Sequence, residues 1–172
     1  MRTANYRSST RGFTLVEVMV SLVVLGIGLL GIAKLVLSSA HSNDSAYLRS
    51  QATELAYAIL DNMRGNRAVA MTQGYDTPLN TAPGVPGPCL GPGGCLPPAL
   101  AQYDVSMWLT RLAAALPSGT GSITTVTSVA PAPAGTTATI TVQWDDAAAQ
   151  TVFGGTAQGA AAPMTVTLET VL

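Results

Sequence analysis

The chain has 172 residues, a length that suits one globular domain together with a membrane or assembly segment. Hydrophobic residues make up 48% of it and charged residues only 10%, a balance too apolar for a disordered chain and too poor in charge for a typical cytosolic enzyme. The net charge is −1, with no basic stripe beyond the N-terminal leader. Binding to nucleic acid needs clustered Lys and Arg, so the composition argues against a nucleic-acid partner.

The N-terminal region combines a basic leader with a long apolar run. Residues 1–12 contain three arginines, Arg2, Arg7 and Arg11, and no acidic residue. Between Glu17 and Lys34 lie 16 uncharged, mostly apolar residues, which cover roughly 24 Å as a helix. With its apolar flanks the run 13–37 can span a bilayer core of about 30 Å. The positive-inside rule then places the N-terminus in the cytoplasm and exports the rest of the chain.

Glu17 is the exception within this apolar run. A carboxylate in the membrane part of a helix costs roughly 2.5–3.5 kcal/mol on insertion scales, so a partner of opposite charge is expected. Cleavage after Gly12 would create one, because Phe13 would then carry a free ammonium group four residues before Glu17, on the same helix face. The pair can form within one chain or between neighbouring chains, where it would fix axial register; this is a hypothesis.

The residues around this glutamate resemble a known signal. The run Arg11-Gly12-Phe13-Thr14-Leu15-Val16-Glu17, followed by an apolar helix, is similar to the prepilin signal of type IV pilins and type II secretion pseudopilins. The resemblance implies that a prepilin peptidase cuts between Gly12 and Phe13, that Phe13 becomes the N-methylated residue, and that Glu17 is needed for assembly. It implies no cofactor and no catalytic residue.

The same resemblance implies a location and partners. The protein would sit in the inner membrane as a single-pass chain, with the N-terminus in the cytoplasm and the head in the periplasm, and would then enter a pilus. Its partners would be the prepilin peptidase, the lipid bilayer, other minor and major pilins, and the inner-membrane pilus assembly platform. Lys34 stands about where major pilins usually have a proline, which indicates a minor subunit.

Two other interpretations of the N-terminus remain. One is an uncleaved signal anchor, and the other is a secretory signal peptide cut near Ser38-Ser39-Ala40, which has small residues at suitable spacing. Both leave Glu17 unexplained, and the apolar region is long for a secretory signal. A mature chain that starts at His41 would favour the signal peptide.

The chain continues as an amphipathic helix over residues 38–66. Apolar residues recur there at helical spacing: Leu48, Ala52, Leu55, Ala56, Ile59, Leu60 and Met63. No proline interrupts residues 13–64, so one helix of about 50 residues, near 75 Å long, is expected. Gly65 follows as a stop signal. The apolar stripe of this second half should bury against the sheet of a globular head.

A Gly/Pro-rich loop over residues 72–98 contains the two cysteines, Cys89 and Cys95. In an exported chain, two cysteines this close predict a disulfide. Zinc is the alternative, but two thiolates fill only half of a tetrahedral site and the single histidine, His41, is remote in sequence. The disulfide is therefore favoured, and no metal site is predicted.

The remaining segments predict a small α+β head over residues 67–172. Residues 98–116 form a second helix, with Trp108 in the core. Three stretches then carry strand signals: 122–129, 137–144 and 164–172. We expect a three- or four-stranded antiparallel meander with its apolar face on the long helix. The predicted fold class is α+β and type IV pilin-like: a long N-terminal helix, transmembrane in its first half, packed on a small antiparallel sheet.

The adjacent carboxylates Asp145 and Asp146 close the second of these strands. A carboxylate pair can serve acid–base or metal chemistry. Neighbouring residues at a strand end point apart, however, so we interpret this pair as a solvated turn. With one histidine and no nucleophile–base spacing elsewhere, the sequence does not predict an enzyme.

Residues 43–66 carry a second resemblance, together with Trp108 to Gly119 and the strand end 141–145. They are similar to the family of minor pilins called type IV pilus modification protein PilV. The implied function is a minor pilin that primes or regulates pilus assembly, with roles in twitching motility and adhesion. A minor pseudopilin of a type II secretion system is the nearest alternative. A third and more distant class of function is a head that binds a ligand, for adhesion or DNA capture. Loss of the leader leaves five basic and nine acidic residues, which disfavours DNA binding by charge.

Overall fold

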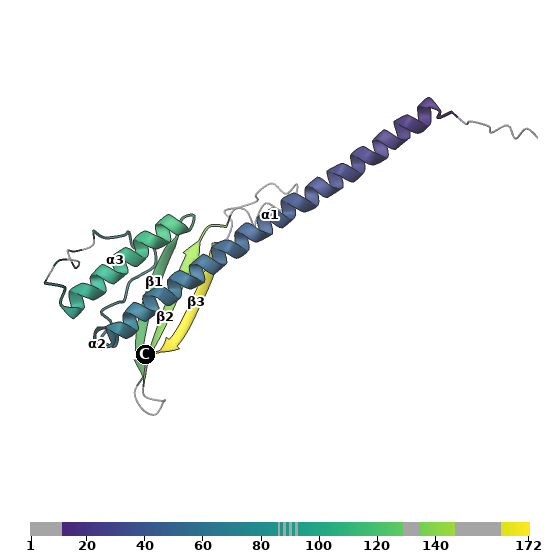
Figure 1. The fold of residues 1–172 in the computed structure, drawn as a ribbon. Helices are drawn as coiled ribbons and strands as arrows, with labels where there is room; N and C mark the ends of the chain where they lie inside the picture. Colours follow the sequence, from purple (N-terminus) through teal and green to yellow (C-terminus); the bar gives the residue numbers. More distant parts are fainter. Residues whose placement is uncertain are drawn as a thin grey trace, which may run out of the picture. The chain divides into compact units, whose positions relative to one another are not determined.

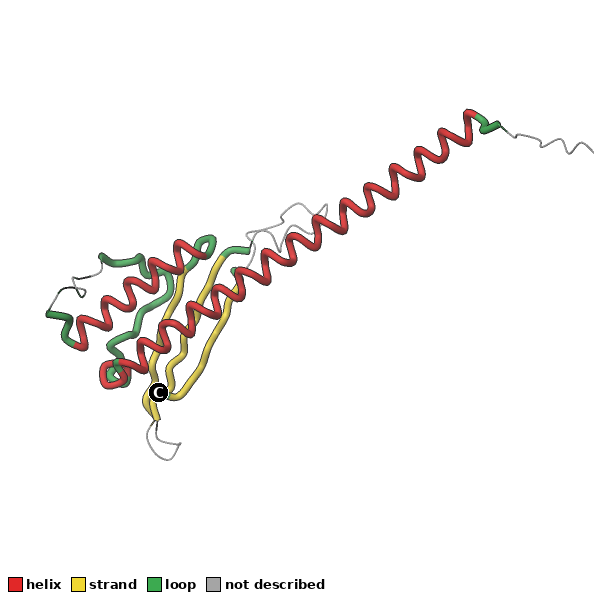
Figure 2. Tube along the Cα trace, viewed as in Figure 1, coloured by secondary structure: helices red, strands yellow, loops and turns green. Residues whose placement is uncertain are grey.

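The computed structural model describes residues 12–85, 87, 89, 91, 93–128, 135–146 and 163–172 (Figures 1 and 2). Two compact units divide the chain, one ending at Ala40 and the other running from His41 to Leu172. The helix α1, Leu15–Gly65, contributes to both units. The sequence predicts one uninterrupted helix over nearly the same residues, and the structure confirms it.

Within the second unit, α1 is held by one buried stripe. Its five buried residues are spaced four, three, one and three positions apart: Ala52, Ala56, Ile59, Leu60 and Met63. Leu48 and Leu55 are partly buried beside them. This spacing places the stripe on one helix face, and the helix stops at Gly65 as the sequence predicts.

The sheet of this unit has three antiparallel strands in the order β1-β2-β3. The strands are β1 Thr120–Ser128, β2 Gly135–Trp144 and β3 Met164–Val171. Ile123 pairs with Ile140, which pairs with Leu168 on its other side. Every second residue of β2 from Thr136 to Trp144 is buried, so the period-2 pattern of the sequence selects the inner face. The predicted α+β class is confirmed.

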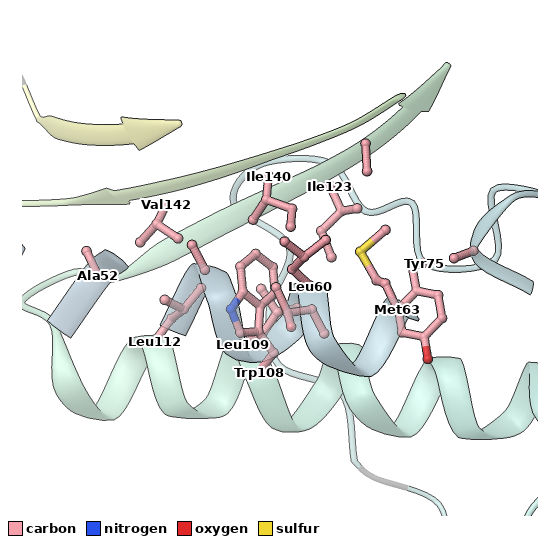
Figure 3. Close-up of a cluster of buried hydrophobic side chains, with 14 of the residues drawn as sticks. Ala52, Leu60, Met63, Tyr75, Trp108, Leu109, Leu112, Ile123, Ile140 and Val142 are labelled. Atoms are coloured by element: carbon pink, nitrogen blue, oxygen red, sulfur yellow. The ribbon is translucent and has the colours of Figure 1, made fainter. Parts of the chain in front are cut away.

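The helix α3, Pro97–Ala115, completes the core on the same face as α1 (Figures 1 and 3). It begins with a proline at its first position, where the missing N–H has no helical acceptor to lose. Its buried residues are Ala101, Trp108, Leu109 and Leu112. Figure 3 shows the last three gathered with Leu60 and Met63 of α1 and with Ile123, Ile140 and Val142 of the sheet.

One close approach in this core requires a glycine. A Cβ on Gly121 of β1 would lie less than 3.0 Å from ring atoms of Trp108 and from a methyl group of Leu112. The strand therefore passes directly against the indole ring of α3. Any side chain at this position would push helix and strand apart.

Three features were not predicted. A short helix α2, Arg67–Ala70, follows α1. Thr77 forms an isolated antiparallel bridge with Ile123, so the loop pairs with the outer edge of β1. The interpretation of Asp145 and Asp146 as a solvated turn is wrong for the second residue, because Asp146 is only 1% exposed while Asp145 is exposed.

The burial of Asp146 has a visible cause. The hydroxyl of Ser45 on α1 donates a hydrogen bond to Asp146 Oδ2 at 2.5 Å. A carboxylate can remain buried when it accepts such bonds. The side chain thus ties the end of β2 to the long helix, and the two neighbouring carboxylates do point apart as the strand geometry requires.

Candidate processing and assembly site

The start of α1 is organised by Thr14. Its carbonyl accepts hydrogen bonds from the backbone N–H groups of Glu17 and Val18, at 3.1 and 3.3 Å. Its hydroxyl Oγ1 also accepts from the Glu17 N–H, at 3.3 Å. A threonine that satisfies the otherwise orphaned donors of the first turn is a helix N-cap. The helix therefore begins two residues after the Gly12–Phe13 peptide bond.

Gly12 and Phe13 lie just outside the helix and are exposed. Phe13 has 83% of its surface accessible. A Cβ built on Gly12 would meet no atom of the described residues within 4 Å. Nothing among the described residues therefore requires a glycine at position 12, and both residues that this peptide bond joins are exposed.

Glu17 occupies the first turn of α1 and is also exposed. The free N–H groups of a first turn carry partial positive charge, which favours a carboxylate there. Its side chain has no hydrogen-bond or ion-pair partner among the described residues, although the backbone carbonyl of Glu17 accepts from the Ser21 hydroxyl at 2.7 Å. The leader arginines lie outside the described residues. The structure thus brings Gly12, Phe13 and Glu17 together within six consecutive residues at one helix end.

The helix after Glu17 exposes a continuous apolar surface. The large hydrophobic side chains from Phe13 to Leu37 are between 49% and 83% exposed. In the described part of the chain, α1 is the one helix long and apolar enough to cross a membrane, with a mean hydropathy of 2.5 over its best window and none of that window buried. Such a surface needs lipid or protein around it.

Two carboxylates of the head, those of Asp76 and Asp104, accept hydrogen bonds from buried hydroxyl groups. The hydroxyl of the fully buried Tyr75 donates to Asp104 Oδ2 at 2.7 Å. Burial raises the pKa of the Tyr75 phenol well above its ordinary value, and the bond to Asp104 raises that pKa further. The backbone N–H and the hydroxyl of Thr125 both donate to Asp76. These contacts tie the loop after α2 to α3 and to β1.

The head has a cavity beside Asp104 and a larger one, of about 510 Å³, beside Cys89 and Cys95. A small cavity of about 70 Å³ lies between α1 and α3 and is lined partly by Asn62, Asp104 and Arg111. No group of three or more His, Cys, Asp or Glu side chains that could hold a metal ion occurs among the described residues. The structure joins Cys89 and Cys95 in a disulfide.

Two residues that shape these sites are not among the residues predicted from the sequence. Thr14 was not recognised as the helix cap, although Thr14-x-x-Glu17 is the spacing of a capping box, in which the N-cap hydroxyl bonds the backbone of the third helical residue. Ser45 was not recognised as the partner of Asp146, because the two residues are 101 positions apart and no local pattern joins them.

Comparison with known proteins bears on the N-terminus alone. Residues 7–33 match the family described as the prokaryotic N-terminal methylation motif. No curated protein matches the chain significantly, and no solved structure does either. The matched residues include Gly12, Phe13, Thr14 and Glu17, together with most of the exposed apolar helix. This motif implies processing by a prepilin peptidase, anchoring in a membrane and assembly with pilins, and it supports a type IV pilin-like protein.

Proposed function

We propose that this chain is a minor pilin of the type IV pilus, of the kind called modification protein PilV. The observation that carries the proposal is the exposed apolar helix headed by Gly12, Phe13 and Glu17, whose carboxylate has no partner among the described residues, within the matched methylation motif. A helix end of this composition serves a subunit that first sits in lipid and later packs against other subunits.

The proposed processing step is hydrolysis of the Gly12–Phe13 bond by the prepilin peptidase. Water adds across this peptide bond, leaving a carboxylate on Gly12 and an ammonium group on Phe13. The exposure of Phe13 and the free space around Gly12 support access by the peptidase. Methylation of the Phe13 nitrogen keeps it a protonatable amine, so the positive charge near Glu17 persists.

Assembly follows from the charges at the helix end. Glu17 is unfavourable in lipid, and the Phe13 ammonium offers it a partner of opposite sign. Pairing between neighbouring chains would fix how far each helix slides along the next. Removal of the leader also removes the arginines that hold the N-terminus in the cytoplasm. The subunit can then leave the inner membrane and enter the pilus.

The proposed organisation has four parts. Residues 1–12 are the leader, 13–37 the transmembrane and assembly half of α1, 38–66 its amphipathic half, and 67–172 the periplasmic head with its Cys89–Cys95 disulfide. The partners are the peptidase, the bilayer, minor and major pilins, and the inner-membrane assembly platform. The minor-pilin assignment rests on the resemblance of residues 43–66 and on Lys34 in place of a proline. A minor pseudopilin of a type II secretion system is the alternative.

A clean deletion with complementation tests the function. We expect the deletion to reduce surface pili and twitching and to leave exoenzyme export intact. The intact gene should restore both pili and twitching. A loss of exoenzyme export with normal pili would instead favour the pseudopilin alternative. Normal pili, twitching and export together would contradict both assignments.

A further inference from the structure

The sheet of the head has two edges, and its register decides which backbone groups face outward at each. The Leu172 N–H donates to the Thr136 carbonyl at 2.9 Å, so this is a hydrogen-bonded pair. Antiparallel ladders alternate between bonded and non-bonded pairs. The even-numbered residues of β3 are therefore bonded to β2, and the odd-numbered ones direct their N–H and C=O groups away from the sheet: Thr165, Thr167, Glu169 and Val171. By the same alternation, the outward groups of β1 also belong to odd-numbered residues.

The outer edge of β1 is closed by the loop that precedes α3. The N–H of Ile123 donates to the carbonyl of Thr77, and the N–H of Thr77 donates to the carbonyl of Ile123, both at 3.0 Å. The next outward N–H, that of Thr125, donates to Asp76 Oδ1 at 3.1 Å. Another strand cannot pair with this edge unless residues 76 and 77 are displaced.

The outer edge of β3 lacks such a cover among the described residues (Figure 1). There, no group accepts from the four outward N–H groups, and the Val171 carbonyl receives only the Thr170 hydroxyl, at 3.5 Å. β3 pairs with β2 over all eight of its residues without a bulge. It contains no Pro or Lys, which commonly protect an edge strand, and it is rich in Thr and Val, which favour strands. The edge is therefore a continuous template for one more strand.

The inner face of β3 is also incompletely covered. Ile140 and Val142 of β2 are fully buried, whereas the β3 residues paired with them, Leu168 and Val166, are only partly buried. Side chains on one face of adjacent strands are close neighbours. A further strand with apolar residues at every second position would therefore bury the inner side chains of β3 more completely.

Charge distinguishes between the possible occupants of this edge. Glu169 is the one charged residue of β3, its side chain is exposed, and its neighbour on β2 is the uncharged Thr139. Opposite charges on adjacent strands favour pairing. A second copy of β3 offers no Lys or Arg to Glu169, and residues 147–163, which connect β2 to β3, offer none either. A matching strand must therefore come from a different protein.

We propose that the β3 edge binds an extended segment of another protein in the same compartment, which joins the sheet as a fourth strand. The residues of this segment alternate between apolar side chains on the inner face and Thr- or Ser-like side chains on the outer face, with a Lys or Arg beside Glu169. Backbone hydrogen bonds to the four outward residues supply the affinity, and the alternating side chains supply the specificity. The inference goes beyond the function proposed above, because it names the surface and the chemistry by which a partner joins the head.

Amide hydrogen exchange, read at single residues by mass spectrometry, tests the proposal. The full-length protein is compared in two states: purified in detergent micelles, and within the complex in which mild detergent extracts it from its native membranes. In the purified chain the outward amides of β3 should exchange fast, while the even-numbered amides are protected. In the complex the outward amides should exchange at least about tenfold more slowly. Protection would then extend along every residue of the strand.

Two variants weaken the edge in different ways. Thr167→Pro removes one outward N–H and leaves the bonds between β3 and β2 in place, because that ladder uses the even-numbered residues. Glu169→Lys reverses the exposed charge and leaves the backbone unchanged. In the complex, each variant should speed exchange at the remaining outward amides by at least about fivefold. Thr167→Val keeps the N–H and the strand preference, so it should behave like the unmodified protein.

The blocked edge of β1 provides a matched control. Thr127→Pro removes an outward N–H there and should leave exchange along β3 in the complex unchanged. Thermal melts of the purified variants check folding, and Glu169→Lys decides the outcome alone if Thr167→Pro unfolds.

Three results would overturn the proposal. The first is fast exchange of the outward amides in the complex. The second is undiminished protection in the complex of the Glu169→Lys variant. The third is protection already present in the purified chain, which would show that the chain covers its own edge or, where protection grows with concentration, that a second copy does.

Discussion

Thr14 Oγ1 accepts a hydrogen bond from the backbone N–H of Glu17 at 3.3 Å. Thr14, which caps α1, is thereby bonded to Glu17, the acidic residue of the first helical turn. This contact fixes the backbone of Glu17 in the first helical turn, four residues after Phe13. Helix capping and the proposed processing chemistry therefore share one short segment.

Replacement of Thr14 by alanine should loosen the helix start. The Glu17 N–H loses its side-chain acceptor, which costs about 1 kcal/mol. Amides of residues 16–18 should then exchange about fivefold faster, as measured by hydrogen exchange on the uncleaved full-length protein in micelles. Thr14→Ser keeps the hydroxyl and should behave like the unmodified protein. Equal exchange in the alanine and serine variants would show that the cap does not stabilise this end.

Replacement of Glu17 by alanine should separate membrane insertion from assembly. The variant loses a charge that costs roughly 2.5–3.5 kcal/mol in a bilayer, so it should insert at least as well as the unmodified chain. It should nevertheless be missing from sheared surface filaments, because the proposed partner of the Phe13 ammonium is gone. Immunoblots of membrane and filament fractions measure both quantities.

Glu17→Gln sharpens this test, since it keeps the shape of the side chain and removes only its charge. We expect it to fail in assembly as the alanine variant does. Ser21→Ala is a suitable control because it removes a hydroxyl one turn later, whose bond is to the Glu17 carbonyl. Normal incorporation of the glutamine variant would mean that charge pairing is not what Glu17 provides.

The contact between Trp108 and Gly121 should appear as an energetic coupling. Gly121→Ala alone overfills the space beside the indole and should cost about 1–3 kcal/mol of unfolding free energy. Trp108→Phe alone loses the bond from Nε1 to the Leu55 carbonyl at 3.0 Å, worth about 1 kcal/mol, and leaves space. The double variant should cost less than the sum, by at least about 0.5 kcal/mol, in denaturant melts of the full chain. If the cost of the double variant equals the sum of the two single costs in unfolding free energy, the two residues are not in contact.

The free energy of unfolding should decrease at alkaline pH because the phenol of Tyr75 is buried. Its phenol has an ordinary pKa of 10.0, and burial raises that pKa in the folded head. Above about pH 10 the unfolded chain releases this proton while the folded chain keeps it. The unfolded state then binds fewer protons, so the free energy of unfolding decreases as pH rises. Thermal melts between pH 9 and 11.5 should show this decline, and Tyr75→Phe should flatten it. An unchanged decline in that variant would assign it to other groups.

Much of the fold could be predicted because its helices and strands have clear local sequence patterns. The long helix follows from an unbroken helical pattern, and the inner face of β2 follows from strict alternation up to Trp144. The bridge between Thr77 and Ile123 could not be predicted, because it joins a loop to a strand across 46 positions without a local pattern. Asp146 was misjudged for the same reason, since its burial depends on Ser45, a distant residue on α1.

The candidate site was predictable for a different reason. Gly12, Phe13 and Glu17 lie in one short run, so their arrangement needs no tertiary structure. The structure adds the Thr14 cap and the exposure of the apolar surface that follows. It also shows that nothing among the described residues needs a glycine at position 12, which agrees with the proposal that the prepilin peptidase recognises that residue.

Mass spectrometry of the mature N-terminus tests the central claim most directly. The protein should be purified from its native membranes and from sheared filaments, then digested and sequenced. Cleavage after Gly12 predicts an N-terminal peptide that begins with Phe13 carrying one added methyl group on its nitrogen. A mature chain that begins at His41, or one that retains residues 1–12, would contradict the account.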